Sequence, residues 1–93
     1  MAYFFEWDPA KADANAGKHG VTFDEASTVF GDPLALLMLD PEHSVNEQRH
    51  LLLGMSSQQR LCVVAFAERS PRTRLISARR ATPQERRRYE AKG

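Results

Sequence analysis

The sequence contains few of the residues that build disulfide-linked or metal-bound folds. Cys62 is the single cysteine and lies in an apolar run, which excludes a disulfide framework and predicts a buried thiol. The three histidines do not combine with Cys62 in a zinc-binding spacing, so we expect no metal site. No apolar run approaches the roughly 18 to 20 residues that span a bilayer, and no basic signal-peptide region opens the sequence. We therefore expect a soluble cytoplasmic protein that does not insert into membranes.

Common catalytic motifs are missing as well. There is no glycine-rich loop of the P-loop or dinucleotide type, so nothing supports a nucleotide cofactor. A serine-hydrolase elbow of the form G-x-S-x-G is also absent, since Gly54-Met55-Ser56 supplies only its first half. Catalysis, if present, must use acidic, basic and arginine side chains without a cofactor.

The 93 residues are enough for one domain with a small core. Charge is distributed unevenly along them. Residues 1–47 hold nine carboxylates against Lys11 and Lys18, whereas residues 48–93 hold eleven lysines and arginines against three carboxylates. Ten of those eleven are arginines, which favour bidentate recognition of phosphate or carboxylate groups. We therefore expect a polyanion or an acidic protein as the partner.

Patterns of apolar residues and end signals predict an α+β domain over residues 1–93. A helix is expected at 9–18, with Asp8 as its N-cap and Gly20 closing it. A second is expected from the T-x-x-E box at Thr22 up to 31–33, and a third from Pro83 onward, where Thr82 and Glu85 form another capping box. Strands are expected at residues 3–7, 34–39, 48–55, 60–68 and 73–80. The segment 60–68 is apolar on both alternating faces, as in a central strand that is buried on two sides.

The links between the last four expected strands are short. Short links imply an antiparallel meander, because parallel neighbours need long crossovers. We expect two helices before the meander and one after it, packed on one face of a curved, mainly antiparallel sheet. Alternation places residues 47, 49, 51 and 53 on one face of their strand, and residues 75, 77 and 79 on one face of the last strand. If these faces coincide, Glu47, Arg49, Arg79 and Tyr89 line one concave site.

Residues 73–89, TRLISARRATPQERRRY, gather the strongest candidate binding groups. Arg79 and Arg80 end the last strand, and a short turn leads to a helix on which Arg86 and Tyr89 are three residues apart and share a face. Guanidinium groups beside a phenol are suited to hold a phosphodiester. The alternative interpretation is a solvated basic helix that follows an edge strand.

Three segments, in this order, resemble the BrnT family of toxins from bacterial type II toxin-antitoxin systems: EWDPAKADANAGKHGVTFDEAS, DPEHSVNEQR and RLISARRATPQERRRYE. The resemblance covers nearly the whole chain. It implies a RelE-like fold and a metal-independent ribonuclease that arrests translation by cutting RNA. It also implies a cognate antitoxin of the BrnA type, which folds against the toxin in a hetero-oligomer and carries a DNA-binding module that represses the shared operon.

Metal-free RNA cleavage needs a base for the ribose 2′-hydroxyl, positive charge at the phosphorane-like transition state, and an acid for the leaving oxygen. The candidate catalytic residues are His19, Glu47, Arg49, Arg79 and Tyr89. The candidate RNA-binding residues are Lys18, Arg80 and Arg86. We assign Arg79, with Arg49 or Arg80, to the scissile phosphate.

The proton-transfer roles have more than one candidate each. Glu47 or His19 is the candidate base, and Tyr89 or His19 is the candidate for proton delivery or base stacking. Each residue also has a purely structural interpretation: Glu47 in a cross-strand ion pair with Arg49, His19 as a helix cap, and Tyr89 as a core aromatic. The sequence therefore leaves the identity of the general acid open.

Two other classes of function fit the same charge pattern. A non-catalytic, regulatory nucleic-acid-binding module would use the basic helix as a phosphate anchor and would bind RNA without cutting it. An adaptor for acidic proteins would use the basic half for docking alone. Strand scission separates the ribonuclease from both.

Overall fold

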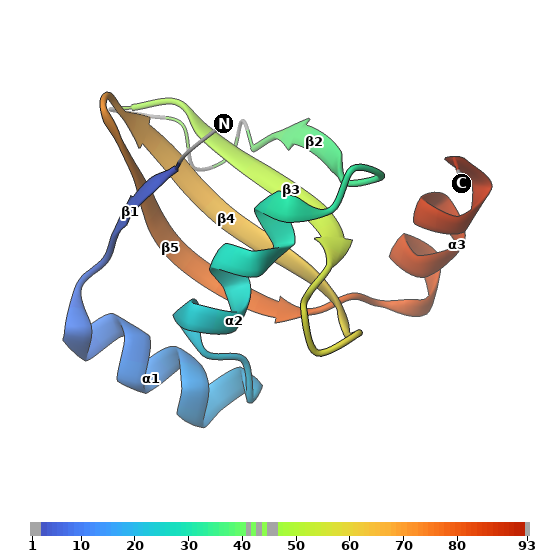
Figure 1. Ribbon diagram of the computed structural model, residues 1–93, viewed down its shortest axis with the longest axis horizontal. Coiled ribbons are helices and arrows are strands. Elements are labelled where there is room, and N and C mark those ends of the chain that lie inside the picture. Colours follow the sequence, from blue (N-terminus) through green and yellow to red (C-terminus); the bar gives the residue numbers. More distant parts are fainter. Residues whose placement is uncertain (1–2, 41, 43, 45–46, 93) are drawn as a thin grey trace.

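The computed structural model describes residues 3–40, 42, 44 and 47–92 (Figure 1). Its strands are β1 (Phe4–Glu6), β2 (Leu36–Leu39), β3 (Arg49–Met55), β4 (Leu61–Arg69) and β5 (Arg72–Arg80). Its helices are α1 (Pro9–His19), α2 (Phe23–Thr28) with the short 3₁₀ turn η1 (Val29–Gly31), and α3 (Pro83–Lys92). The strands form one sheet in the order β1-β5-β4-β3-β2. Strands β2 to β5 pair antiparallel and β1 pairs parallel with β5, so the predicted α+β fold with a meander is confirmed.

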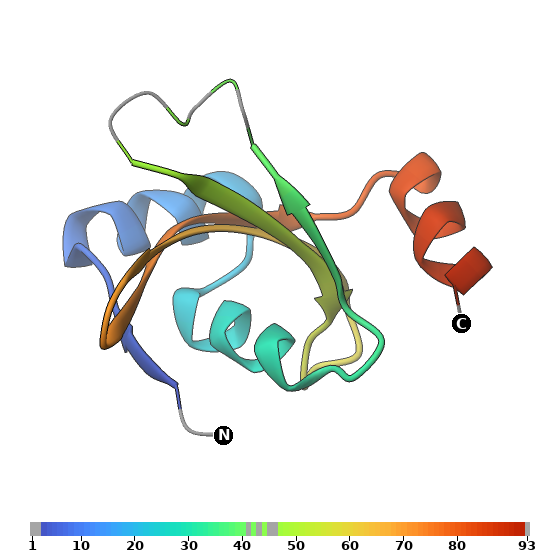
Figure 2. The same cartoon turned by 90° about the horizontal axis from the view of Figure 1, so that it is seen from above.

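The central strand β4 is buried from Leu61 to Ala67, as its two apolar faces predicted. On one face, Val64 and Phe66 pack with Phe23 and Val29 of the α2–η1 segment. On the other face, Val63 and Leu61 pack with Leu53 and with Tyr89 of α3. Figure 2 shows α2 under the arch of β4 and β5, with α3 beyond one end of the sheet. The prediction that all helices cover one face was wrong, because both apolar faces of β4 require a cover.

A β-bulge interrupts the pairing of β4 with β5. Ala65 lies opposite Ser77, but its neighbour Phe66 lies opposite Leu75, so Ile76 is an extra residue in β5. Leu75 therefore packs on the α2 side of the sheet, whereas Ser77 and Arg79 lie opposite Ala65 and Val63 on the other side. The prediction that residues 75, 77 and 79 share one face was wrong, because strict alternation does not account for an inserted residue.

Helix α1 begins and ends as its sequence predicted. Asp8 caps its first turn by accepting a hydrogen bond from the N–H of Ala10 at 2.9 Å. Gly20 closes it in the left-handed conformation, with φ +71°, and its N–H bonds to the carbonyl of Ala16. Asn15 is buried, while the rest of this helix is exposed or half-buried, and it accepts from the N–H of Ala78 in β5 at 3.0 Å. Helix α1 is thereby fixed along β5.

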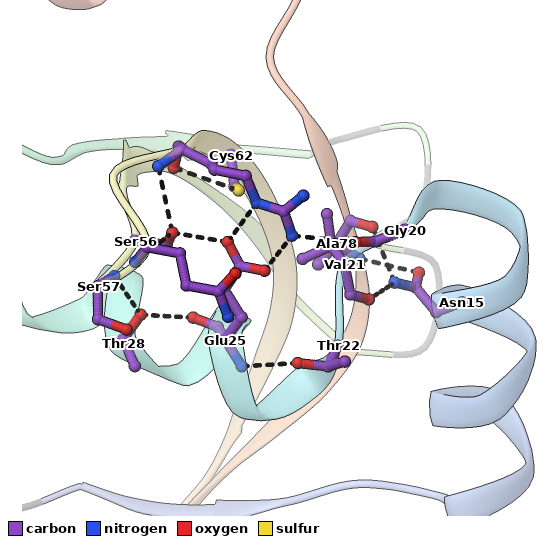
Figure 3. A network of polar contacts seen from close by, with 12 residues as sticks. Asn15, Gly20, Val21, Thr22, Glu25, Thr28, Ser56, Ser57, Cys62 and Ala78 are labelled. Carbon is purple, nitrogen blue, oxygen red and sulfur yellow. Dashed lines mark hydrogen bonds and ion pairs between the residues drawn. The ribbon is translucent and has the colours of Figure 1, made fainter.

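Glu25 has a different role from the one that the T-x-x-E box predicted. Thr22 does accept from the N–H of Glu25 at 3.0 Å, which is half of a capping box. The carboxylate of Glu25 instead turns into the protein, where it pairs with Arg60 and accepts from the hydroxyl of Ser56 at 2.7 Å (Figure 3). The hydrogen bond from Arg60 holds the pKa of Glu25 below its usual value, although burial opposes this. This network connects α2 to the turn between β3 and β4.

Candidate functional site

A hollow of about 320 Å³ lies on the face of the sheet away from α2. We call it the arginine cleft, and its lining residues are Asp40, Arg49, Leu51, Ala65, Ile76, Ser77 and Arg79. Arg49 of β3 and Arg79 of β5 lie on the same face of the sheet, since Leu51 and Ser77 lie opposite Ala65 of β4 from its two sides. The expected coincidence of these two strand faces therefore holds for Arg49 and Arg79. Two guanidinium groups against the one carboxylate of Asp40 make the cleft suitable for an anion.

Arg49, one of the residues that line the cleft, has an unused hydrogen-bond donor. Its Nε is buried and has no hydrogen-bond partner among the residues that the structure describes. A buried donor without a partner is costly, and natural proteins keep few of them outside functional sites. An oxygen atom of a bound phosphate or carboxylate would satisfy this donor.

Arg79 is held by Glu85 of α3. Its Nη1 donates to Glu85 Oε1 at 2.8 Å, and its Nη2 donates to Oε2 at 2.9 Å. Glu85 also forms the predicted capping box with Thr82, whose N–H donates to Oε1 at 2.8 Å. The ion pair with Glu85 therefore uses both terminal nitrogens of Arg79. Its Nη1 also donates to the carbonyl of Arg80 at 3.3 Å, whereas its Nε donates to no residue in the described part of the chain and remains available for a ligand.

The ion pair makes the stability of the fold depend on pH. Hydrogen bonds from Arg79 lower the pKa of Glu85 to about 2, from an ordinary value of 4.5. A carboxylate with a lowered folded-state pKa stabilises the fold above its ordinary pKa, and this contribution is lost as the pH falls toward 2. We expect Glu85→Gln to lose less unfolding free energy than the parent between pH about 5 and about 2.5, measured by urea unfolding.

Glu90→Gln is the matched control for this measurement, because Glu90 lies on the same helix and its carboxylate is 3.8 Å from Arg86 at an exposed position. We expect this control to follow the parent over the same pH range. Identical acid profiles for the parent and Glu85→Gln would contradict the role given to the Arg79–Glu85 pair.

A second hollow of about 230 Å³ adjoins the arginine cleft. We call it the α1 hollow, and its lining residues are Lys11, Ala14, Asn15, Lys18, His19, Ile76 and Ser77. It shares Ile76 and Ser77 with the arginine cleft, so the bulged part of β5 lies between the two. Lys18 and His19 were expected at the site, and the structure places both in this neighbouring hollow.

Other expected site residues make contacts away from the arginine cleft. Glu47 accepts from Arg69 Nη2 at 2.7 Å and from its Nε at 3.0 Å, so its partner is Arg69 and not Arg49. These bonds lower the pKa of Glu47. Arg80 and Arg86 are exposed, and Arg86 lies 3.8 Å from Glu90. None of the three lines the cleft or the α1 hollow.

Tyr89 is part of the core that joins α3 to the sheet. Its side chain packs with Leu53 and Val63, and its hydroxyl donates to Asp32 Oδ2 at 2.5 Å. The hydrogen bond to Asp32 raises the pKa of Tyr89 to about 12, which makes the phenol a weak acid at neutral pH. This arrangement matches the structural interpretation of Tyr89 as a core aromatic.

Sequence reasoning missed several residues of the site. Ser77 and Asp40 line the arginine cleft, and Lys11 lines the α1 hollow. Glu85 was recognised only as part of a capping box. The signal for Lys11 was its spacing of seven residues from Lys18, which places both lysines on one face of a helix.

A larger hollow of about 420 Å³ lies on the α2 side of the sheet. Its lining is mainly apolar, includes Phe30, Leu37 and Phe66, and contains no lysine or arginine. It therefore lacks the groups that hold a phosphate. Within the described ranges, no three His, Cys, Asp or Glu side chains gather closely enough to hold a metal ion. No helix in this part of the chain is both long and apolar enough to cross a membrane.

Comparison with known proteins gives matches of two kinds. A family model described as ribonuclease toxin, BrnT, of type II toxin-antitoxin system matches residues 7–85. The fold is similar to that of the ribonuclease toxin BrnT from Brucella abortus, seen in a 1.1 Å crystal structure, with a TM-score of 0.63 and 20% sequence identity. That match covers 87% of this chain and 99% of the Brucella chain. None of the curated proteins matches the sequence.

Proposed function

The chain belongs to the BrnT family of ribonuclease toxins from type II toxin-antitoxin systems, and from this premise we propose that it is a metal-independent endoribonuclease that inhibits translation by cutting RNA. A type II system also implies a protein antitoxin as partner, and we propose one of the BrnA type in a hetero-oligomer with this chain. The observation that carries the site assignment is the buried, unpartnered Nε of Arg49, a residue that lines the arginine cleft together with Arg79.

In the proposed reaction, the arginine cleft binds the scissile phosphate. A non-bridging oxygen accepts from the Nε of Arg49, and another accepts from the Nε edge of Arg79 that Glu85 leaves open. Negative charge increases on these oxygens as the ribose 2′-oxygen attacks the phosphorus. Two fixed guanidinium groups stabilise that charge more in the transition state than in the ground state, which is the condition for catalysis.

The proton transfers are assigned to His19. It is the one histidine among the residues that line the arginine cleft or the α1 hollow, and imidazole is the side chain most often used for proton transfer near neutral pH. His19 accepts the proton of the 2′-hydroxyl as the new P–O bond forms. The bond from phosphorus to the 5′-oxygen breaks, and that oxygen takes up a proton from the imidazolium. The products are a 2′,3′-cyclic phosphate and a 5′-hydroxyl.

Glu47 and Tyr89 have no catalytic part in this proposal. The lowered pKa of Glu47 makes it a weak base, and it is already paired with Arg69. The hydroxyl of Tyr89 is committed to Asp32, and its raised pKa makes it a weak acid. Both residues support the fold around the site.

The proposed function is tested by incubating the purified protein with labelled RNA in EDTA. We expect cleavage to continue in the chelator and to leave 2′,3′-cyclic phosphate ends, because attack by the 2′-hydroxyl requires no metal ion. DNA of the same sequence should stay intact, since it lacks the nucleophile. Intact RNA, both alone and in a repeat that contains ribosomes, would instead favour the non-catalytic regulatory module.

A further inference from the structure

The acidic half of the chain carries its only two lysines on one face of α1. Residues 1–47 hold nine carboxylates, and against them only Lys11 and Lys18. The two lysines are seven residues apart, so they lie on the same side of the helix, about 10 Å apart along its axis. Both are exposed, both line the α1 hollow, and neither has an ion-pair partner in the part of the chain that the structure describes.

Helix α1 separates charges of opposite sign. Asp13 lines a different hollow, together with Asp24 and Trp7 on the side of the helix that faces α2. The lysines face the side that adjoins β5. The N-terminal half is therefore acidic overall, yet the surface that it presents beside the arginine cleft is basic.

Asn15 fixes the lysine face of α1 against the edge of β5. Its Nδ2 donates to the carbonyl of Ala78 at 2.9 Å and to that of Val21 at 2.9 Å, while its Oδ1 accepts from the N–H of Ala78 at 3.0 Å (Figure 3). Asn15 lies four residues after Lys11 and three before Lys18, so it shares their face. Ala78 lies between Ser77 and Arg79 in β5. The amide thus sets the position of the lysines relative to the arginine cleft.

The two hollows form one path across β5. They share Ile76 and Ser77, and the bulge in β5 is the reason that two consecutive residues of the strand both line this surface. The path runs from Arg49 and Arg79 over Ser77 to the lysines of α1. A strand of RNA that is held at the arginines would have its next phosphates on the α1 side.

We propose that the lysine face of α1 is a binding subsite for the single-stranded RNA that flanks the scissile phosphate, with Lys11 and Lys18 holding backbone phosphates. The subsite reads no base directly, because ammonium groups bind phosphates as point charges. Because of this subsite, the enzyme favours RNA that extends beyond the two nucleotides joined by the scissile phosphate. This inference rests on the proposed function, since it assumes that the arginine cleft holds the cleaved phosphate.

The test compares two substrates in single-turnover cleavage: a dinucleotide, which contains the cleaved phosphate but no flanking phosphates, and a 12-nucleotide single-stranded RNA. We expect the Lys11→Ala/Lys18→Ala variant to lose about tenfold more kcat/KM on the long RNA than on the dinucleotide. Its salt dependence on the long RNA should also become shallower, by roughly 0.7 in the slope for each phosphate that the variant no longer binds. Arg87→Ala, which removes an exposed charge from α3, is the control and should affect both substrates alike.

Equal losses on the two substrates, or no loss on the long one, would overturn the subsite. A parent that cuts neither substrate, alone or in a repeat that contains ribosomes, would overturn the proposed function but would still leave the subsite open to test. In that case, fluorescence anisotropy with a 2′-O-methyl 12-nucleotide RNA measures binding without cleavage. The lysine variant should then bind about tenfold more weakly than the parent and Arg87→Ala, and unchanged binding would count against the subsite. Circular dichroism of each variant checks that it is folded.

Discussion

Replacing Arg49 with alanine should lower RNA cleavage by about 10² to 10³-fold in a protein that remains folded. The Nε of Arg49 is buried and has no partner among the described residues. Removing it therefore deletes the proposed hydrogen bond to the phosphate, and the fold loses no hydrogen bond that this nitrogen makes. Loss of one preorganised donor to a developing negative charge has an effect of this size in other enzymes. Single-turnover cleavage and urea unfolding of the same preparations measure the two outcomes.

Arg49→Lys separates the charge of Arg49 from its geometry. Lysine keeps the positive charge but lacks the planar fork of donors, so we expect cleavage between that of the parent and that of the alanine variant. Arg79→Ala is a less specific test, because it also leaves Glu85 without its partner at the start of α3. If Arg49→Ala cut RNA within twofold of the parent, the arginine cleft would not be the site of cleavage.

Asn15→Ala should lower the free energy of unfolding by about 3 kcal/mol, the largest stability effect that we expect from a single substitution in α1. The substitution removes three hydrogen bonds and leaves the N–H and carbonyl of Ala78 and the carbonyl of Val21 without their partner. Asn15 is 7% exposed, so water does not replace these bonds readily. Urea unfolding measures the change as a shift in the midpoint.

Asp13→Ala is the matched control for Asn15→Ala. Asp13 lies on the same helix at an exposed position, and alanine is a better helix former than aspartate, so stability should stay the same or rise slightly. A loss of less than about 1 kcal/mol in Asn15→Ala would mean that α1 is held to β5 mainly by apolar contacts. A loss near the expected size would support the conclusion that the amide of Asn15 holds the lysine face of α1 against β5.

The local structure of this chain could be predicted because short-range signals agree with each other. Asp8 and Pro9 start α1, Gly20 ends it, and Thr82 with Glu85 starts α3, all as their sequence patterns indicated. The apolar run at 60–68 became the central strand. Each of these features depends on residues within about one turn or one strand of each other, so the sequence contains all that is needed to predict them.

The candidate site was predictable only in part. Arg49 and Arg79 line the same cleft as expected, because alternation along β3 and β5 gives their faces correctly near the cleft. Glu47 was expected beside them but pairs with Arg69, and Tyr89 bonds to Asp32, which is 57 residues away in the chain. No local pattern indicates a partner at such a separation.

The sequence by itself determined the α+β meander, the caps of its helices, the division of charge along the chain, and the motifs that place it in its family. Tertiary structure decided which charges are unpaired and which are used by the fold. The bulge at Ile76 turned Leu75 to the core side and Ser77 to the cleft, and Asn15 placed the lysines of α1 beside them. The physical reason is that pairing of a charge depends on strand register and on which helix packs on which face, and both are set by contacts between residues far apart in the chain.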